Sequence, residues 1–130
     1  MSNHRRPGLW NTYRTSYLRS PAWFARRDRW FEEETATNWP LRCVACGQDA
    51  SKRQLELHHL EYGPNLFTHG VWHADEPHED LVAMHPYCHE LLHRLIDRDQ
   101  ILSRHLSRRV ASARAIARLR AKLTTLREAR

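Results

Sequence analysis

The sequence lacks the long apolar runs and leader segments that mark membrane and secreted proteins. No apolar stretch approaches the roughly 20 residues that a membrane-spanning helix needs. The opening residues, MSNHRRPGLW, do not include the apolar centre of a secretory signal. No internal repeat is visible, and 130 residues suffice for one domain with a short appendage. We therefore expect a cytoplasmic chain without a membrane partner.

Cysteine is scarce: the chain has three, an odd number that cannot pair completely. Cys43 and Cys46 are separated by only two residues, and in an intracellular protein such a pair binds zinc more often than it forms a disulfide. Gly47 follows directly and permits the tight turn that lets two thiolates reach one ion. This spacing is typical of a zinc knuckle.

The second half of such a knuckle must come from elsewhere in the chain. Cys88 is the one remaining cysteine, and His85 precedes it by three residues, so this pair repeats the two-residue gap. The predicted ligand set is Cys43, Cys46, His85 and Cys88, because four protein ligands without an open position are typical of structural zinc. The alternative is that Cys88 is a buried thiol and His85 binds nothing.

Acidic residues are almost absent from the last thirty positions. Residues 101–130 contain nine Arg or Lys and one acid, Glu128, whereas the first hundred contain twelve basic and fourteen acidic residues. The net charge of +6 is therefore a property of the C-terminal segment. A concentrated positive segment favours a polyanionic partner, nucleic acid before a membrane surface, because binding releases counterions. A merely solvated helix face is the alternative.

The hydrophobic pattern predicts an α+β fold that is mostly helical. Residues 1–19 show no period and are interpreted as a loose arm. Ser20 and Pro21 suit the cap and first position of a helix, which we expect to run to about Glu34. The aromatic residues of this helix share one face, and core packing is favoured over base stacking for them. They are Trp23, Phe24, Trp30 and Phe31.

The remaining chain is predicted to form two strands followed by helices. Residues 52–60 alternate as a strand does, residues 81–84 form a short apolar second strand, and a long loop joins them. Residues 86–96 have a helical pattern. A long amphipathic helix follows, whose narrow apolar stripe could pack back on the domain or pair with another copy. The stripe consists of Leu102, Leu106, Val110, Ala113, Ile116, Leu119, Leu123 and Leu126.

Histidines are concentrated between residues 55 and 93, which contain eight of the ten. His89 and His93 are four apart on the predicted helix, so both imidazoles can face one cation. A strand packed on that helix would add His58, and three protein ligands leave coordination positions open, as in catalytic sites. His59 would point to the other face of the strand, where a neutral imidazole suits a general base. The loop histidines are expected to be solvated: His69, His73 and His78.

Taken together, these motifs resemble an HNH endonuclease of the ββα-metal class with a zinc knuckle. They are C-x2-C-G, LELHHL, the Asp80-Leu81 pair and H-x2-C-H-x3-H, and the resemblance covers Ser20 to about Arg94. It implies a ββα core with an N-terminal helix, dependence on a divalent metal, and nicking or cleavage of DNA. The expected domains are the arm at 1–19, a nuclease domain at 20–96 and a basic helical extension at 97–130.

The resemblance also implies roles for single residues. His59 matches the general base, His58 the metal ligand at the strand end, His89 the helix ligand, and His93 an additional ligand used in some members. Asp80 stands where Asn is more usual, and we expect it to fix the loop or to orient His59. A further departure is His85, which replaces the more usual cysteine of the knuckle. The catalytic ion would be Mg2+, Mn2+, Ni2+ or Zn2+, and the structural ion Zn2+.

The sequence thus predicts hydrolysis of DNA phosphodiester bonds, with His59 activating water. The alternative is a non-catalytic, zinc-bound module for DNA binding or assembly that uses the same knuckle and basic helix. The expected partners are DNA, a second copy bound through the C-terminal helix, or packaging proteins of a phage or bacterium. Small proteins of this family occur in phages and bacteria, where packaging, restriction and mobility are all represented.

Overall fold

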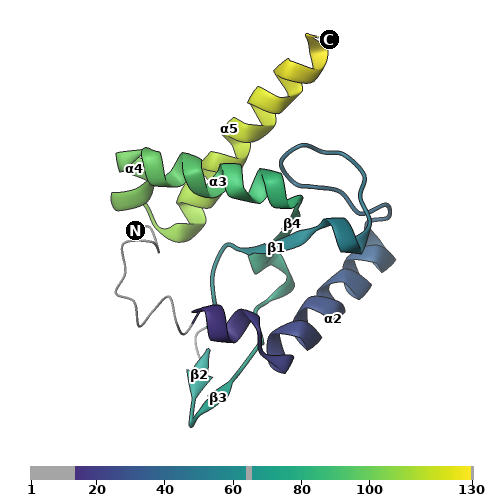
Figure 1. Ribbon diagram of the computed structural model, residues 1–130, viewed down its shortest axis with the longest axis vertical. Helices are drawn as coiled ribbons and strands as arrows, with labels where there is room; N and C mark the ends of the chain where they lie inside the picture. Colours follow the sequence, from purple (N-terminus) through teal and green to yellow (C-terminus); the bar gives the residue numbers. More distant parts are fainter. Residues whose placement is uncertain (1–13, 64–65, 130) are drawn as a thin grey trace.

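The fold is α+β and mostly helical, as the hydrophobic pattern predicts (Figure 1). The computed structural model describes residues 14–63 and 66–129. The helices are α2 (Pro21–Thr37), α3 (Pro86–Arg98), α4 (Gln100–Arg104) and α5 (Arg108–Glu128). The strands form two antiparallel pairs, β1 (Glu56–His59) with β4 (Leu81–Met84), and β2 (Phe67–Thr68) with β3 (Val71–Trp72). Single 3-10 turns span Lys52–Gln54 and His78–Asp80.

The sheet of β1 and β4 lies at the centre of the molecule, with α2 on one side and α3 and α5 on the other (Figure 1). His59 lies opposite Leu81 and His58 opposite Val82 in the antiparallel register. β1 is shorter than the predicted strand, because residues 52–54 form a 3-10 turn. Both histidines are buried, since helices cover the strand on both faces.

Helix α2 begins as predicted. The hydroxyl oxygen of Ser20 accepts a hydrogen bond from the backbone N–H of Trp23 at 3.2 Å, and Pro21 fills the first position. The helix continues beyond the expected end to Thr37. Core packing is confirmed for Trp23, Trp30 and Phe31, which are buried. It is wrong for Phe24, which is 52% exposed because it lies at the edge of the buried face.

Part of the expected loose arm is helical, which corrects that expectation for residues 14–18. Residues 1–13 lie outside the described chain, but residues 14–18 are helical and Tyr17 is fully buried. The Tyr17 ring packs against Trp23 and Trp72, with ring centroids 5.6 and 5.4 Å apart. The long loop also contains structure, because β2 and β3 form a hairpin that projects from the domain (Figure 1).

The predicted single C-terminal helix is two helices. α4 ends at Arg104, and α5 restarts at Ser107, whose hydroxyl oxygen accepts from the N–H of Val110 at 3.2 Å. The restart rotates the buried face, so Val110 and Ala113 of the expected stripe are exposed. The buried residues are Ala111, Ser112, Ala115, Ile116 and Leu119. The periodicity of large apolar residues did not reveal this face, because most of its residues are small. Small residues allow α5 to approach α3 closely.

The first half of α5 packs on α3 and α4, while its C-terminal half projects from the domain (Figure 1). Of the two arrangements considered for the stripe, packing back on the domain is the one that occurs over residues 111–119. Leu126 is 54% exposed near the projecting end. None of the helices in the described ranges combines the length and apolar character required to cross a lipid bilayer.

Leu92 on α3 is fully buried between the sheet and α5 and offers a test of this packing. We expect Leu92→Ala to lower the free energy of unfolding by about 2–5 kcal/mol, because the cavity adds to the lost transfer energy. The matched control is Leu126→Ala, the same change at an exposed position. Urea unfolding of the zinc-loaded protein measures both, and equal effects would contradict the described packing.

Candidate functional site

Two clusters of metal-binding side chains flank the start of α3. The first contains Cys43 and Cys46 from the loop before β1, His85 after β4, and Cys88 in the first turn of α3. Their ligand atoms all lie within 4.8 Å of one another, and the Cys46 Sγ and His85 Nδ1 atoms are 3.3 Å apart. The four residues predicted as a set are therefore close enough to bind a metal such as zinc.

The backbone around this cluster favours thiolates. Gly47 has φ +75°, the left-handed conformation that the tight turn requires. The N–H groups of Cys46 and His85 donate to Cys43 Sγ at 3.5 and 3.4 Å. Burial acts to raise the pKa of Cys43, but these donors lower it to about 7. Burial and the neighbouring sulfurs raise the pKa of Cys88 to about 12, so this residue stays a neutral thiol unless a bound cation stabilises its thiolate.

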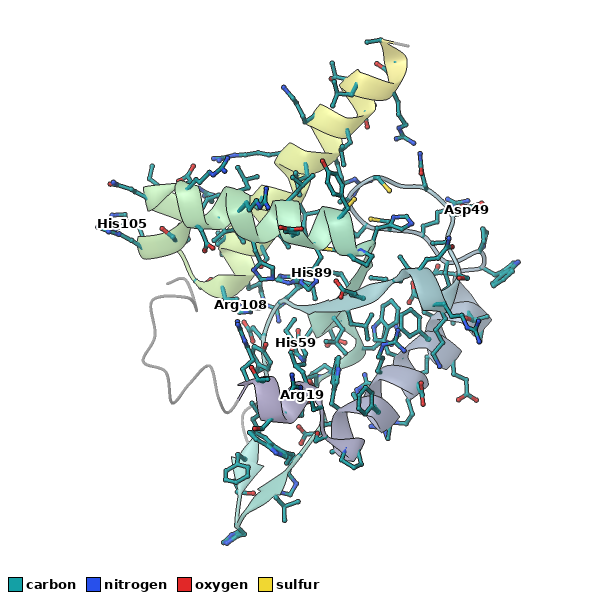
Figure 2. The ribbon with its side chains drawn as sticks, in the orientation of Figure 1. Arg19, Asp49, His59, His89, His105 and Arg108 are labelled. Atoms are coloured by element: carbon teal, nitrogen blue, oxygen red, sulfur yellow. The ribbon has the colours of Figure 1, made fainter. Side chains whose placement is uncertain are left out.

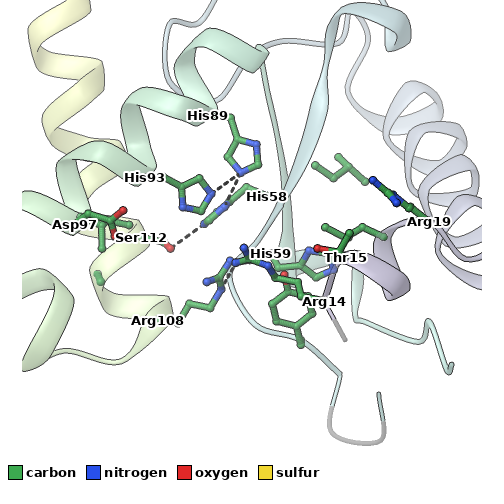
Figure 3. Close-up of a pocket in the computed structure, with 15 residues that line it drawn as sticks. Arg14, Thr15, Arg19, His58, His59, His89, His93, Asp97, Arg108 and Ser112 are labelled. Carbon is green, nitrogen blue, oxygen red and sulfur yellow. Dashed lines mark hydrogen bonds between the residues drawn. The ribbon is translucent and has the colours of Figure 1, made fainter. Parts of the chain in front are cut away.

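The second cluster consists of His58, His89 and His93. His58 Nδ1 lies 3.1 Å from His89 Nε2, which lies 3.0 Å from His93 Nε2 (Figure 3). Tetrahedral ligands around one zinc ion have nitrogens about 3.3 Å apart, since each metal–nitrogen bond is about 2.0–2.1 Å. The strand end and the helix thus bring together all three predicted ligands.

The three imidazoles are neutral at neutral pH. Burial is the main cause that lowers the pKa of each ring, well below its usual range for His58 and to about 4 for His93. The outer nitrogens of two rings have partners, because His58 Nε2 lies 2.9 Å from Ser112 Oγ and His89 Nδ1 lies 3.2 Å from Glu56 Oε1. Such outer contacts leave the inner lone pairs available to a cation.

The histidine cluster borders a cavity, and its three ligands leave the coordination sphere open, whereas the four ligands of the cysteine cluster would close it. The cavity has a volume of about 450 Å³ and is lined by the three histidines and by His59. Three arginines also line it: Arg14, Arg19 and Arg108 (Figure 3). The arginines give this cavity a positive lining suited to an anionic ligand.

His59 lies on the opposite face of β1 from His58, as the strand geometry predicts. Its ring stacks on Tyr62, with centroids 4.1 Å apart and planes at 12°. Its Nε2 atom lies 2.6 Å from the carboxylate of Glu76. Burial lowers the pKa of His59, although Glu76 opposes this effect, so the ring is neutral. Figure 2 shows His59, His89 and Arg108 together, far from His105.

The acidic partner of His59 was not foreseen in the sequence. Asp80 was expected to fix the loop or orient His59, but its carboxylate pairs with Arg109 of α5. Its backbone carbonyl accepts from the N–H of Leu60 at 2.8 Å, so Asp80 joins the loop, β1 and α5. The carboxylate that contacts His59 belongs to Glu76. Burial acts to raise the pKa of Glu76, but donation from His59 and Tyr17 lowers it, so this group is ionised.

The loop histidines behave in two ways. His69 and His73 are exposed, as expected. His78 belongs to neither metal cluster, but its ring is only partly solvated, because it stacks on Trp30 at 4.9 Å and lies 2.7 Å from a carboxylate oxygen of Glu34. His78 therefore attaches the loop to α2.

The sequence did not reveal four residues of the site: Arg108 and Ser112, which line the cavity, and Tyr17 and Glu76, which lie behind His59. Tyr17 and Glu76 belong to segments without periodicity and meet only through folding. Arg108 and Ser112 lie one turn apart on α5. The one feature of the sequence that could have indicated them is a polar side chain on the helical face that packs against the domain. No hydrophobic pattern identifies such residues.

Comparison with known proteins gives no match to a family model, to a curated protein or to a solved structure. The two clusters are therefore interpreted from their own chemistry. One has four ligands with three sulfurs, which is typical of a closed structural site. The other has three imidazoles beside a cavity, which leaves room for water and an anion.

The cysteine cluster can be tested by metal analysis. We expect Cys88→Ser to lose the tightly held zinc and to unfold at a lower temperature, because structural zinc contributes directly to folding. The matched control is His105→Gln, which changes an exposed residue on the far side of the molecule. Elemental analysis and thermal unfolding after dialysis measure both effects. Retention of the wild-type zinc content by Cys88→Ser would contradict the ligand assignment.

Proposed function

We propose that the protein is a metal-dependent HNH endonuclease of the ββα-metal class that hydrolyses DNA phosphodiester bonds. The observation that carries this proposal is the convergence of three neutral imidazoles at a cavity that a fourth histidine, His59, also lines. A protein whose only metal site is a closed structural zinc site would need neither the histidine cluster nor the cavity beside it.

The chain order supports a ββα core. β1 carries His58 and His59 at its end, β4 pairs with it, and α3 follows directly with His89 and His93. This is the order that the resemblance to HNH endonucleases implies. The cysteine cluster would hold structural zinc at the start of α3, so the helix that supplies two catalytic ligands would be fixed there.

His58, His89 and His93 would hold the catalytic ion. Imidazole nitrogens suit Zn2+ and Ni2+, whereas Mg2+ prefers oxygen ligands. When bound, such an ion supplies polarisation of a nonbridging phosphate oxygen and charge compensation at the departing 3′ oxygen.

His59 would act as the general base. With Nε2 bonded to Glu76, Nδ1 is the ring nitrogen left to accept a proton. It takes this proton from water as the water oxygen bonds to phosphorus and the bond to the 3′ oxygen breaks. The products are a 5′-phosphate and a 3′-hydroxyl, which gains its proton from solvent. The neutral state of His59 suits this step.

Arg108 is suited to hold the phosphate. It is the first residue of α5 and lines the cavity, and its Nε–H donates to the carbonyl oxygen of His59 at 2.8 Å. Its guanidinium lies over the Tyr62 ring at 5.3 Å. The positive end of the α5 dipole adds to this charge, so the cavity favours an anion.

Plasmid cleavage tests the proposal. Supercoiled DNA is incubated with the zinc-loaded protein and Mg2+, Mn2+, Ni2+ or added Zn2+, and nicked and linear products are quantified. We expect cleavage, with Zn2+ and Ni2+ more effective than Mg2+. We expect His59→Ala to slow cleavage by about 10²–10⁴-fold, because the general base is lost.

The matched control for this variant is His73→Ala, which removes an exposed loop histidine. Zinc content and thermal unfolding establish that each variant is folded. Wild-type cleavage rates in His59→Ala would rule out its role. Binding of DNA without cleavage under every metal would favour the non-catalytic module for DNA binding or assembly.

The basic helix α5 would contribute phosphate contacts outside the cavity. Arg118 is already paired with Asp99 at 2.9 Å, whereas Arg120 is exposed on the projecting half of the helix. We expect Arg120→Gln to weaken DNA binding uniformly across sequences and to reduce the slope of log affinity against log salt by about 1. Arg118→Gln is the control and should have the smaller effect. Fluorescence anisotropy across salt concentrations measures both, and equal slopes in all three proteins would contradict this role.

A further inference from the structure

A buried carboxylate lies beside the proposed base and belongs to neither metal cluster. Glu76 is 2% exposed and sits in the loop before β4. One of its oxygens, Oε2, accepts two short hydrogen bonds, from the Tyr17 hydroxyl at 2.6 Å and from His59 Nε2 at 2.6 Å. An ionised side chain at such a depth is costly unless it is paired or used.

Three separate segments hold Glu76 in place. The Nε–H of Arg26 on α2 donates to the Glu76 backbone carbonyl at 2.9 Å. Tyr17 belongs to the helical turn at 14–18, and its ring packs against Trp72 of the hairpin. The carboxylate is therefore fixed by α2, the N-terminal turn and the β2–β3 hairpin together.

The contact with Glu76 determines which nitrogen of His59 carries hydrogen. An ionised carboxylate can only accept, so His59 Nε2 must donate and the lone pair must lie on Nδ1. The ring plane is fixed as well, since His59 lies between Tyr62 at 4.1 Å and Trp23 at 4.6 Å. Without the carboxylate, a neutral imidazole could exchange its tautomer or turn over.

We infer that Glu76 is the positioning residue of the proposed base, holding His59 in one tautomer and orientation, and that Tyr17 holds Glu76. This inference rests on the proposed function. It assigns Glu76 no contact with substrate or metal, because its carboxylate bonds only to Tyr17 and His59 among the described residues. A purely structural Glu76 would instead attach the loop to the core and leave turnover of the folded protein unchanged.

The test compares Glu76→Gln, Tyr17→Phe and the control Glu79→Gln, which removes an exposed acid three residues away. Each protein is loaded with zinc and the metal that supports wild-type cleavage, and kcat and KM are measured on a labelled DNA duplex. We expect Glu76→Gln to lower kcat by about 10- to 100-fold with little change in KM, as supporting residues around catalytic groups do. Tyr17→Phe should lower kcat by about fivefold, which corresponds to the loss of one hydrogen bond. Glu79→Gln should leave kcat unchanged.

Nuclear magnetic resonance of the imidazole gives a readout that does not depend on cleavage. The wild-type protein and Glu79→Gln should show a downfield Nε2–H proton for His59, and this resonance should move upfield or vanish in Glu76→Gln. Zinc content and thermal unfolding are measured on the same samples, so that a general loss of structure is separated from a change at His59.

The outcomes separate this inference from the proposed function. A wild-type protein that cuts DNA while Glu76→Gln keeps the same kcat overturns the inference and leaves the proposed function intact. An Nδ1–H tautomer of His59 in the wild-type protein also overturns it, and this result needs no variant. A wild-type protein that fails to cut DNA with any of the four metals overturns the proposed function, and the inference about turnover falls with it.

Discussion

The constraint on which the site depends is the convergence of three thiols and an imidazole at the first turn of α3. Cys43 and Cys46 belong to a loop with little regular structure, and they meet His85 and Cys88 where β4 leads into the helix. A cation there would fix the start and direction of α3. His89 follows Cys88 directly and His93 lies one turn beyond His89, so their positions follow from that attachment.

The C-terminal helix is part of the domain over its first half, and its second half lies beside the cysteine cluster, where Leu123 and Arg127 line a cavity with Cys46 and Cys88. Arg108 bonds to the backbone of His59, Arg109 to the side chain of Asp80, and Ser112 to the ring of His58. The strand that carries both histidines is thus held from α3 and α5 together. The small residues Ala111 and Ala115 make this close approach possible.

The two faces of β1 have different chemistry, and this separation defines the site. One face carries His58 toward α3, where neutral imidazoles surround a point suited to a cation. The other carries His59 into an aromatic enclosure with one buried carboxylate, Glu76. Adjacent residues of a strand point to opposite sides, so one dipeptide serves both environments. Burial on both faces keeps all of these rings neutral.

The sequence by itself determined which side chains gather in the two clusters and the order of the strands and of α3, because short spacings such as C-x2-C and H-x3-H act within one turn or one helix face. It also predicted that His58 and His59 lie on opposite faces of β1. Only the tertiary structure decided that Glu76 rather than Asp80 contacts His59, that Tyr17 holds Glu76 and Arg108 lines the cavity, and that the last helix breaks before Ser107. The contacts of Glu76, Tyr17 and Arg108 join residues far apart in the chain, and their side chains carry no local pattern, so packing alone chooses their partners.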